Sequence, residues 1–156
     1  MLVALLLNFC ALQSGADFRY AEVISDQVEI RAFYDAKAVV VFTAAKGTPV
    51  KVVAEMYPWS KVQIPGGYDL WVYKSLATLD SKTGVYHVKG SRTRSRSKPS
   101  THADSHSLGV FPREADLVPL LIEEDWIKVR APESMSAWVL SAEIKATDAN
   151  LDDAWQ

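Results

Sequence analysis

The sequence predicts an all-β protein made of two tandem, small antiparallel β-barrels. The first reason is an internal repeat: PWSKVQIPGGYDLWV (58–72) aligns without a gap with DWIKVRAPESMSAWV (125–139), so that Trp59 meets Trp126 and Trp71 meets Trp138. Self-similarity at a fixed offset is the signature of a repeated structural unit. The second reason is local, since short segments rich in β-forming residues alternate with turn signals and no stretch keeps a 3.6-residue apolar period.

Length and composition fit this interpretation. The chain has 156 residues, of which 49% are hydrophobic and 23% are charged, with a net charge of −2. These values are typical of a globular protein and not of a disordered or collagen-like one. A unit of roughly 60 residues is only marginally stable through its own core. We therefore expect the two units to pack on each other.

The first 16 residues, MLVALLLNFCALQSGA, form an apolar run followed by small residues. The run is too short to span a bilayer, and it predicts a signal peptide (1–16) cleaved after Ser14-Gly15-Ala16, hence a periplasmic or otherwise exported protein. No Lys or Arg precedes the run, so an apolar strand or helix of a cytosolic protein is the alternative. Asn8 and Phe9 before Cys10 argue against a lipoprotein. A chain cleaved there has no cysteine left for a disulfide or a thiolate metal site.

The first unit is expected to cover residues 17–80. Its strands are predicted at 18–24, 28–33, 39–42, 50–56, 60–64 and 70–76. Lys46-Gly47-Thr48-Pro49 and Pro65-Gly66-Gly67 are turn signals, and the second of them predicts a hairpin between the strands on its two sides.

The polar segment 78–84 is the expected linker, and the second unit is expected to cover residues 81–146. Its strands are predicted at 85–88, 108–111, 117–124, 126–131 and 137–144. Pro119 predicts an edge strand or a bulge, because proline cannot donate a hydrogen bond to a ladder. The polar, acidic end (147–156) is expected to be a flexible tail to which Trp155 offers one docking residue.

The repeated motifs resemble those of the bacterial SH3-like (SH3b) domains. The second unit carries RSKPST (96–101), LGVF (108–111), WIKV (126–129) and AWV (137–139), and the first carries VEIR (28–31), KGTPVKVV (46–53), WSKV (59–62) and LWV (70–72). Ala32-Phe33-Tyr34 replaces the Ser-Gly-Pro common in that family, and Leu70 and Ala137 replace its glycine. The resemblance implies two SH3-like barrels that act as a non-catalytic binding or targeting module of the cell envelope.

Large aromatic side chains are predicted in loops and at strand ends of the first unit. The expected ligand-binding groove is lined by Phe33, Tyr34, Tyr57, Trp59 and Tyr68. Such a groove suits an extended peptide or the face of a sugar, here a peptidoglycan stem peptide or a partner protein, with Asp35 and Asp69 beside it for a cationic group. Aromatics scattered over the surface are the alternative. Trp71 and Trp138 are expected in the core, because aromatic side chains bury large areas.

A second pattern is basic. Arg92, Arg94, Arg96 and Lys98 alternate with small residues, which predicts one face of a strand. Residues 85–113 carry a net charge of +5, and residues 114–156 carry −7. The basic strand is expected to pair with the acidic strand 122–125 and the acidic tail; an anionic partner is the alternative. Nucleic acid is not expected, since the chain as a whole is slightly acidic.

Motifs for catalysis are absent from the sequence: it has no Gly-x-Ser-x-Gly, phosphate loop or His-Glu-x-x-His. His102, Asp104 and His106 are three possible metal ligands, but zinc needs a fourth with firm geometry, and a solvated loop is the expected interpretation. No enzyme activity, metal or cofactor is therefore predicted. A structural or assembly role in an envelope complex is the alternative to binding of a ligand.

Overall fold

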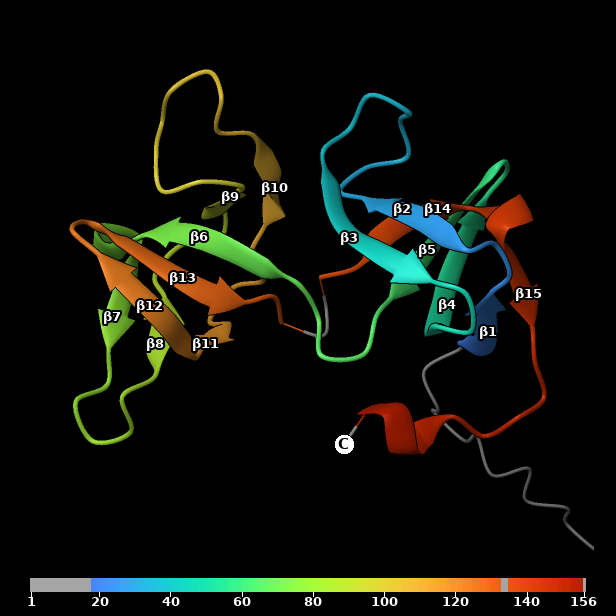
Figure 1. Ribbon diagram of the computed structural model, residues 1–156. Coiled ribbons are helices and arrows are strands. Elements are labelled where there is room, and N and C mark those ends of the chain that lie inside the picture. The colour runs from blue at the N-terminus through green and yellow to red at the C-terminus, as the bar shows by residue number, and fades with distance from the viewer. Residues whose placement is uncertain (1–17, 133–134, 156) are drawn as a thin grey trace, which may run out of the picture.

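A computed structural model describes residues 18–132 and 135–155 of the chain (Figure 1). The predicted all-β class is confirmed: every helix among the described residues is a short 3₁₀ turn, and the sheets are antiparallel and open. The predicted signal peptide and its cleavage site lie outside the described residues. Within them, no helix has the length and apolar character needed to cross a membrane.

The first structural unit, module 1, is a seven-stranded sheet in the order β15-β1-β4-β5-β14-β2-β3. Its strands are β1 (Arg19–Val23), β2 (Gln27–Arg31), β3 (Val40–Ala45), β4 (Pro49–Met56), β5 (Trp59–Gln63), β14 (Ala137–Leu140) and β15 (Ile144–Ala146). The 3₁₀ turn η2 (Ser141–Glu143) joins the last two. Module 1 is therefore built from both ends of the chain.

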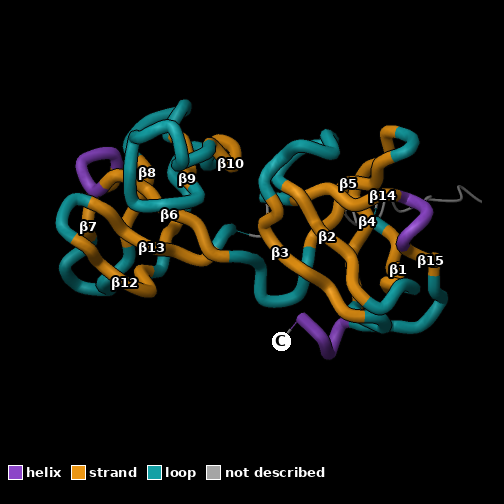
Figure 2. The backbone as a smooth tube through the Cα atoms, turned by 45° about the horizontal axis from the view of Figure 1, so that its top comes forward, coloured by secondary structure: helices purple, strands orange, loops and turns teal. Residues whose placement is uncertain are grey.

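The second structural unit, module 2, contains two smaller sheets, β10-β9-β6-β13-β12 and β11-β8-β7. Its strands are β6 (Asp69–Tyr73), β7 (Ala77–Leu79), β8 (Tyr86–Val88), β9 (Arg94–Arg96), β10 (Ser107–Val110), β11 (Asp116–Leu117), β12 (Pro119–Glu123) and β13 (Trp126–Arg130). The 3₁₀ turn η1 (Lys74–Leu76) joins β6 and β7. Figure 2 shows the two modules side by side.

Strand for strand, the two modules have the same order. Reading β7-β8-β11 and then β12-β13-β6-β9-β10 in module 2 reproduces the order of module 1, with β4 replaced by the pair β11 and β12. Val118 separates that pair, and the adjacent Pro119 begins β12. The predicted role of Pro119 is confirmed, since β12 is the outermost strand of its sheet and its register with β13 shifts between Pro119 and Leu121.

The repeats exchange their last strands. β6, η1 and β7 belong to the first sequence repeat, but β6 pairs with β13 and β9, and β7 pairs with β8. In return, β14 and β15 of the second repeat pair with β5, β2 and β1. The expected boundaries 17–80 and 81–146 therefore do not enclose the two modules, and the hairpin expected at Pro65-Gly66-Gly67 does not form, because β5 and β6 lie in different sheets.

The connection 64–68 runs from module 1 to module 2 (Figure 1), and the described residues 131–132 and 135–136 lie between β13 and β14 in the sequence. The two segments touch where the Ala131 N–H donates to the Tyr68 carbonyl at 2.8 Å. Gly67 has a φ of +63°, and a Cβ there would lie 3.1 Å from the Ala131 carbonyl oxygen. Glycine suits this site for two reasons, since it adopts a positive φ without strain and leaves room for the neighbouring backbone.

Core side chains come from alternate positions of the strands, as expected for sheets with one buried face. In β5 the pattern places Ser60 and Val62 inside, and β14 adds Ala137 and Val139 to the same core. In module 2, Leu70 and Val72 of β6 meet Ile127 and Val129 of β13. The buried side chains of each module thus come from both sequence repeats, and those of the two modules form one cluster.

The acidic C-terminal segment docks on module 1. The turn η3 (Asp152–Trp155) follows β15, and the hydroxyl of Tyr20 donates a hydrogen bond to Asp152. This bond raises the pKa of Tyr20 to about 12. The ammonium of Lys51 lies 4.3 Å from the centre of the Trp155 ring, a cation–π distance. Docking of Trp155 is confirmed, and the flexibility of residues 147–156 stays a prediction.

Candidate functional site

The structure does not bring the five predicted groove residues together. Tyr68 is buried, with 3% of its surface exposed, and offers no face to a ligand. Tyr57 projects into solvent with 92% exposed and lines none of the pockets described below. Phe33 and Tyr34 line one pocket, and Trp59 lines another. The single aromatic groove predicted from the sequence is therefore divided, and Tyr68 is removed from it.

Tyr68 is buried because it lies in the connection that crosses between the modules. Its hydroxyl has no hydrogen-bond partner within the described part of the chain, and burial raises its pKa to about 12. Asp69, which was expected beside the groove, begins β6 in module 2. Its carboxylate bonds to Lys128 at 2.9 Å and to Arg130 at 3.0 Å across the β6–β13 pair. Asp69 thus stabilises the pairing of β6 with β13 in module 2.

Phe33 and Tyr34 lie beside Trp138, which corrects the prediction for that tryptophan. Trp138 is half-exposed, its ring meets that of Tyr34 edge-on at 5.0 Å, and the Lys61 ammonium lies 6.0 Å from it. The pocket of about 280 Å³ at this surface also includes Val110 and Met135. Trp71, the counterpart of Trp138, is buried as predicted, with 9% exposed.

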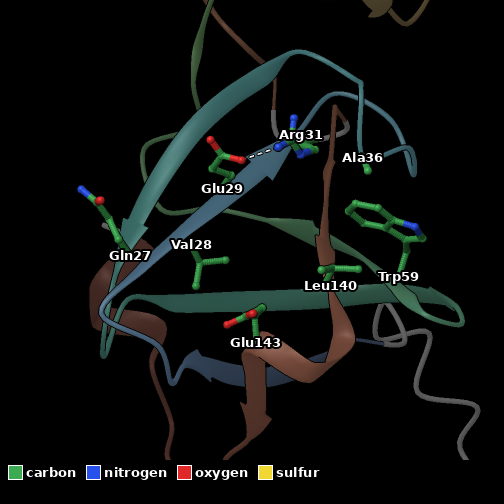
Figure 3. Close-up of a pocket in the computed structure, with 8 residues that line it drawn as sticks. All are labelled: Gln27, Val28, Glu29, Arg31, Ala36, Trp59, Leu140 and Glu143. Atoms are coloured by element: carbon green, nitrogen blue, oxygen red, sulfur yellow. Dashed lines mark hydrogen bonds and ion pairs between the residues drawn. The ribbon is translucent and has the colours of Figure 1, made fainter.

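A pocket with a volume of about 450 Å³, which we call groove 1, lies on module 1 (Figure 3). This volume falls in the range of small-ligand sites. Groove 1 is lined by Gln27, Val28, Glu29 and Arg31 of β2, Ala36 of the following loop, Trp59 of β5, Leu140 of β14 and Glu143 of η2. Two of its residues, Leu140 and Glu143, come from the second sequence repeat, so groove 1 depends on the strand exchange.

Charges in groove 1 are nearly balanced, with an acidic excess. Glu29 accepts a hydrogen bond from the Arg31 guanidinium, whose other nitrogen donates to the Ala38 carbonyl at 2.6 Å. At the far end of groove 1, Glu143 accepts a hydrogen bond from the Ser25 hydroxyl. Figure 3 shows the Trp59 indole on the side toward Ala36, away from Glu143. Groove 1 therefore offers an aromatic surface at one end and a carboxylate at the other.

An equivalent pocket, groove 2, lies on module 2 and has a volume of about 270 Å³. It is lined by Tyr73, Leu76, Arg92, Arg94, Arg96, Thr101 and Trp126. Each of these corresponds to a residue of groove 1: Trp126 to Trp59, Tyr73 to Leu140, Leu76 to Glu143, Arg92 to Gln27, Arg94 to Glu29, Arg96 to Arg31 and Thr101 to Ala36. The strand register supports this equivalence, because Trp138 faces Arg31 and Trp71 faces Arg96 in the two sheets.

The basic residues do not form the expected ion pairs with the acidic strand 122–125 and the acidic tail. Lys98 bonds to Asp104 at 2.8 Å, and this contact holds the pKa of Asp104 below its usual value. Among the described residues, Arg92, Arg94 and Arg96 form no ion pair; Arg96 donates to the Ser105 carbonyl at 3.0 Å. The acidic C-terminal segment instead contacts Tyr20 and Lys51 of module 1. Internal compensation is therefore wrong for the three arginines.

The loop that contains His102, Asp104 and His106 shows no grouping of three metal-ligating side chains within residues 18–132 and 135–155. Asp104 is held by Lys98. The remaining histidine, His87, bonds through Nδ1 to Asp116 at 2.7 Å on the paired strands β8 and β11.

Most residues of groove 1 carry no local signal in the sequence. Gln27 and Glu29 are polar residues that alternate with buried ones on β2, a pattern typical of any half-exposed strand. Leu140 and Glu143 belong to the other repeat, and no local signal connects them with Trp59. The signal that was available is the repeat itself, since aligning Leu140 with Tyr73 and Glu143 with Leu76 reveals two sites with the same plan.

Residues 25–77 match the family model of the bacterial SH3 domain. The match supports this family for the first repeat and gives no support for a second copy. Domains of the family are generally non-catalytic binding modules that mediate interactions. The matched segment runs from the start of β2 through β6 and η1, so it includes strands that lie in different modules here. No curated protein matches the chain.

Proposed function

We propose that the protein is an exported, non-catalytic module that binds a peptide of the cell envelope in groove 1. The favoured ligand is a peptidoglycan stem peptide, and a segment of a partner protein is the close alternative. The match of residues 25–77 to the bacterial SH3 domain supports the general role of a binding module. The observation that carries the specific proposal is groove 1, in which Trp59 and the carboxylate of Glu143 line the same pocket.

The chemistry of groove 1 fits a short peptide that carries a free amine. A half-buried tryptophan at a pocket wall supplies apolar contact at low entropy cost, and tryptophan is enriched among residues that dominate binding energy. Glu143 would pair with the cationic amine. Gln27 has amide donors and acceptors suited to a peptide backbone. Arg31 is held by Glu29 and Ala38, so it would orient the pocket wall.

Trp59→Ala is expected to weaken binding to purified sacculi, or to a synthetic stem peptide, by about 30-fold, the loss of about 2 kcal/mol typical of a binding hot spot. Glu143→Gln should weaken binding less than Trp59→Ala does, and it should remove part of the salt dependence of binding. Tyr57→Ala is the matched control, because Tyr57 is a fully exposed aromatic near Trp59 that lines no pocket. Calorimetry or a sedimentation assay gives the affinities. Absent binding by the wild type, or equal binding by the Trp59 variant, would reject the proposal.

A second function, assembly with another envelope protein, is favoured by one observation. Edge strand β12 and the residue before it expose four apolar side chains: Val118, Leu120, Leu121 and Ile122, each with about half of its surface accessible. An exposed edge can accept a strand from a partner chain. If groove 1 binds no envelope peptide, this edge becomes the better candidate for the protein's interaction surface.

A further inference from the structure

Groove 2 occupies the same position on module 2 as groove 1 on module 1, but its charge is opposite. Where groove 1 has Gln27, Glu29 and Glu143, groove 2 has Arg92, Arg94 and Leu76. No carboxylate side chain lines groove 2. Asp125 accepts a long hydrogen bond of 3.4 Å from the hydroxyl of Tyr73, which lines groove 2. The position of the groove is thus repeated in both modules, while the charge of the side chains that line it differs.

Arg94 and Arg96 lie on strand β9, and Arg92 lies in the turn that precedes it. Thr93 and Ser95 between them are buried, with 4% and 0% of their surfaces exposed, so Arg94 and Arg96 project together from the opposite face. Side chains two apart on an extended strand are separated by about 6.6–6.8 Å. Carboxylates at alternate positions of an extended peptide have the same spacing, so two of them could meet Arg94 and Arg96 in charge-assisted hydrogen bonds, while Arg92 lines the same pocket.

The remaining wall of groove 2 is aromatic and apolar. The rings of Tyr73 and Trp126 meet edge-on at 5.2 Å, and Leu76 adds an exposed aliphatic side chain beside them. This surface suits the apolar side chains that would lie between the acidic ones. A pocket of about 270 Å³ holds a few side chains, and the net charge of −2 of the whole chain does not favour a long polyanion. These features favour a short peptide over a nucleic acid.

We propose that groove 2 is a second binding site, which takes an extended segment of a partner protein with Asp or Glu at alternate positions. The inference is independent of the ligand of groove 1, because the two sites share no residue. It gives carboxylate partners to the three arginines, which form no ion pair among the described residues. Two grooves of opposite preference on one chain would let the protein hold two different partners at once.

The probe is a fluorescein-labelled peptide, Gly-Glu-Leu-Glu-Leu-Glu-Gly, with Glu-Glu-Glu-Leu-Leu as the core of a reordered control. Fluorescence anisotropy at about 50 mM and about 200 mM salt measures affinity. We expect Arg94→Glu to weaken binding at least about tenfold, because charged hydrogen bonds of this kind typically contribute more than one power of ten. Arg113→Glu is the matched control: it changes net charge equally, is exposed, and lies outside groove 2. It should stay within about twofold of the wild type.

Further experiments distinguish binding in groove 2 from binding in groove 1. Trp59→Ala in groove 1 should leave the acidic peptide bound, so failure of one proposal does not entail failure of the other. Melting temperatures of the Arg94 and Arg113 variants should match, which excludes unfolding as the cause. Equal loss in both variants, equal affinity for the reordered peptide, or tighter binding of a single-stranded oligonucleotide than of the acidic peptide would overturn the proposal.

Discussion

Val139→Asp is expected to unfold module 1, although Val139 belongs to the second sequence repeat. Its side chain is fully buried, and its partner across the strand pair is Ser60 of β5. An unpaired carboxylate at such a site costs more than about 4 kcal/mol, a large part of the stability of a small protein. Leu140→Asp is the matched control, because the adjacent Leu140 is 39% exposed and should tolerate a charge far better. Thermal denaturation followed by circular dichroism measures both.

The module that each substitution destabilises identifies the strand pairing. In the milder variant Val139→Ala, hydrogen exchange should accelerate mainly in β1–β5 of module 1, which β14 completes. Val72→Ala, the equivalent change in β6, should accelerate exchange mainly in β8–β13 of module 2. Faster exchange of the opposite module in each case would mean that each repeat folds on its own strands.

Trp71→Ala is expected to destabilise the protein by about 3–5 kcal/mol, the usual cost of removing a buried tryptophan. Trp71 is 9% exposed and sits on β6 between Lys128 of β13 and Arg96 of β9. For a chain of this size, such a loss lowers the melting temperature on the order of 10 °C. Trp138→Ala should cost clearly less, because Trp138 is half-exposed and contacts the exposed ring of Tyr34. Calorimetry of both variants checks the difference, and equal losses would contradict it.

The strands could be predicted from the sequence because their signals are local. Turn residues and alternating apolar positions mark β4, β5, β12 and β13, and Pro119 marks an edge strand and a bulge. The equivalence of Trp59 with Trp126 follows directly from the repeat. These features depend on neighbouring residues or on aligned copies, and both can be read without knowing which strands pair.

The strand exchange could not be predicted in this way. β6 and β14 are copies of one element, and either of them offers a buried Val and an adjacent Trp to β5. Local sequence therefore leaves the two pairings equivalent. The same ambiguity explains the errors in the candidate groove. Tyr68 was placed in a hairpin turn, but it lies buried in a crossing connection.

The charge of each groove was predictable only in part. The strand face predicted from the alternation in residues 92–98 is confirmed for Arg94 and Arg96, which flank buried Ser95 in β9, whereas Arg92 and Lys98 lie outside the strand. Their partners were assigned wrongly, because complementary net charge between segments does not show that the segments meet. The acidic end of the chain contacts Lys51 instead.

Disulfide trapping tests the strand exchange most directly. In a Cys10→Ser background, Glu22→Cys is combined with Lys145→Cys or with Thr78→Cys, the position equivalent to 145 in the other repeat. Glu22 faces Lys145 across β1 and β15, whereas Thr78 faces His87 across β7 and β8. Facing residues of antiparallel strands lie within the Cα separation that a disulfide spans. The pair Thr78→Cys and His87→Cys is the positive control, which shows that a cysteine at position 78 can form a disulfide. We expect intramolecular disulfides in 22/145 and 78/87 and none in 22/78, as read by mass spectrometry of the monomer. A disulfide in 22/78 with none in 22/145 would show that each repeat closes on itself and would contradict the exchanged fold.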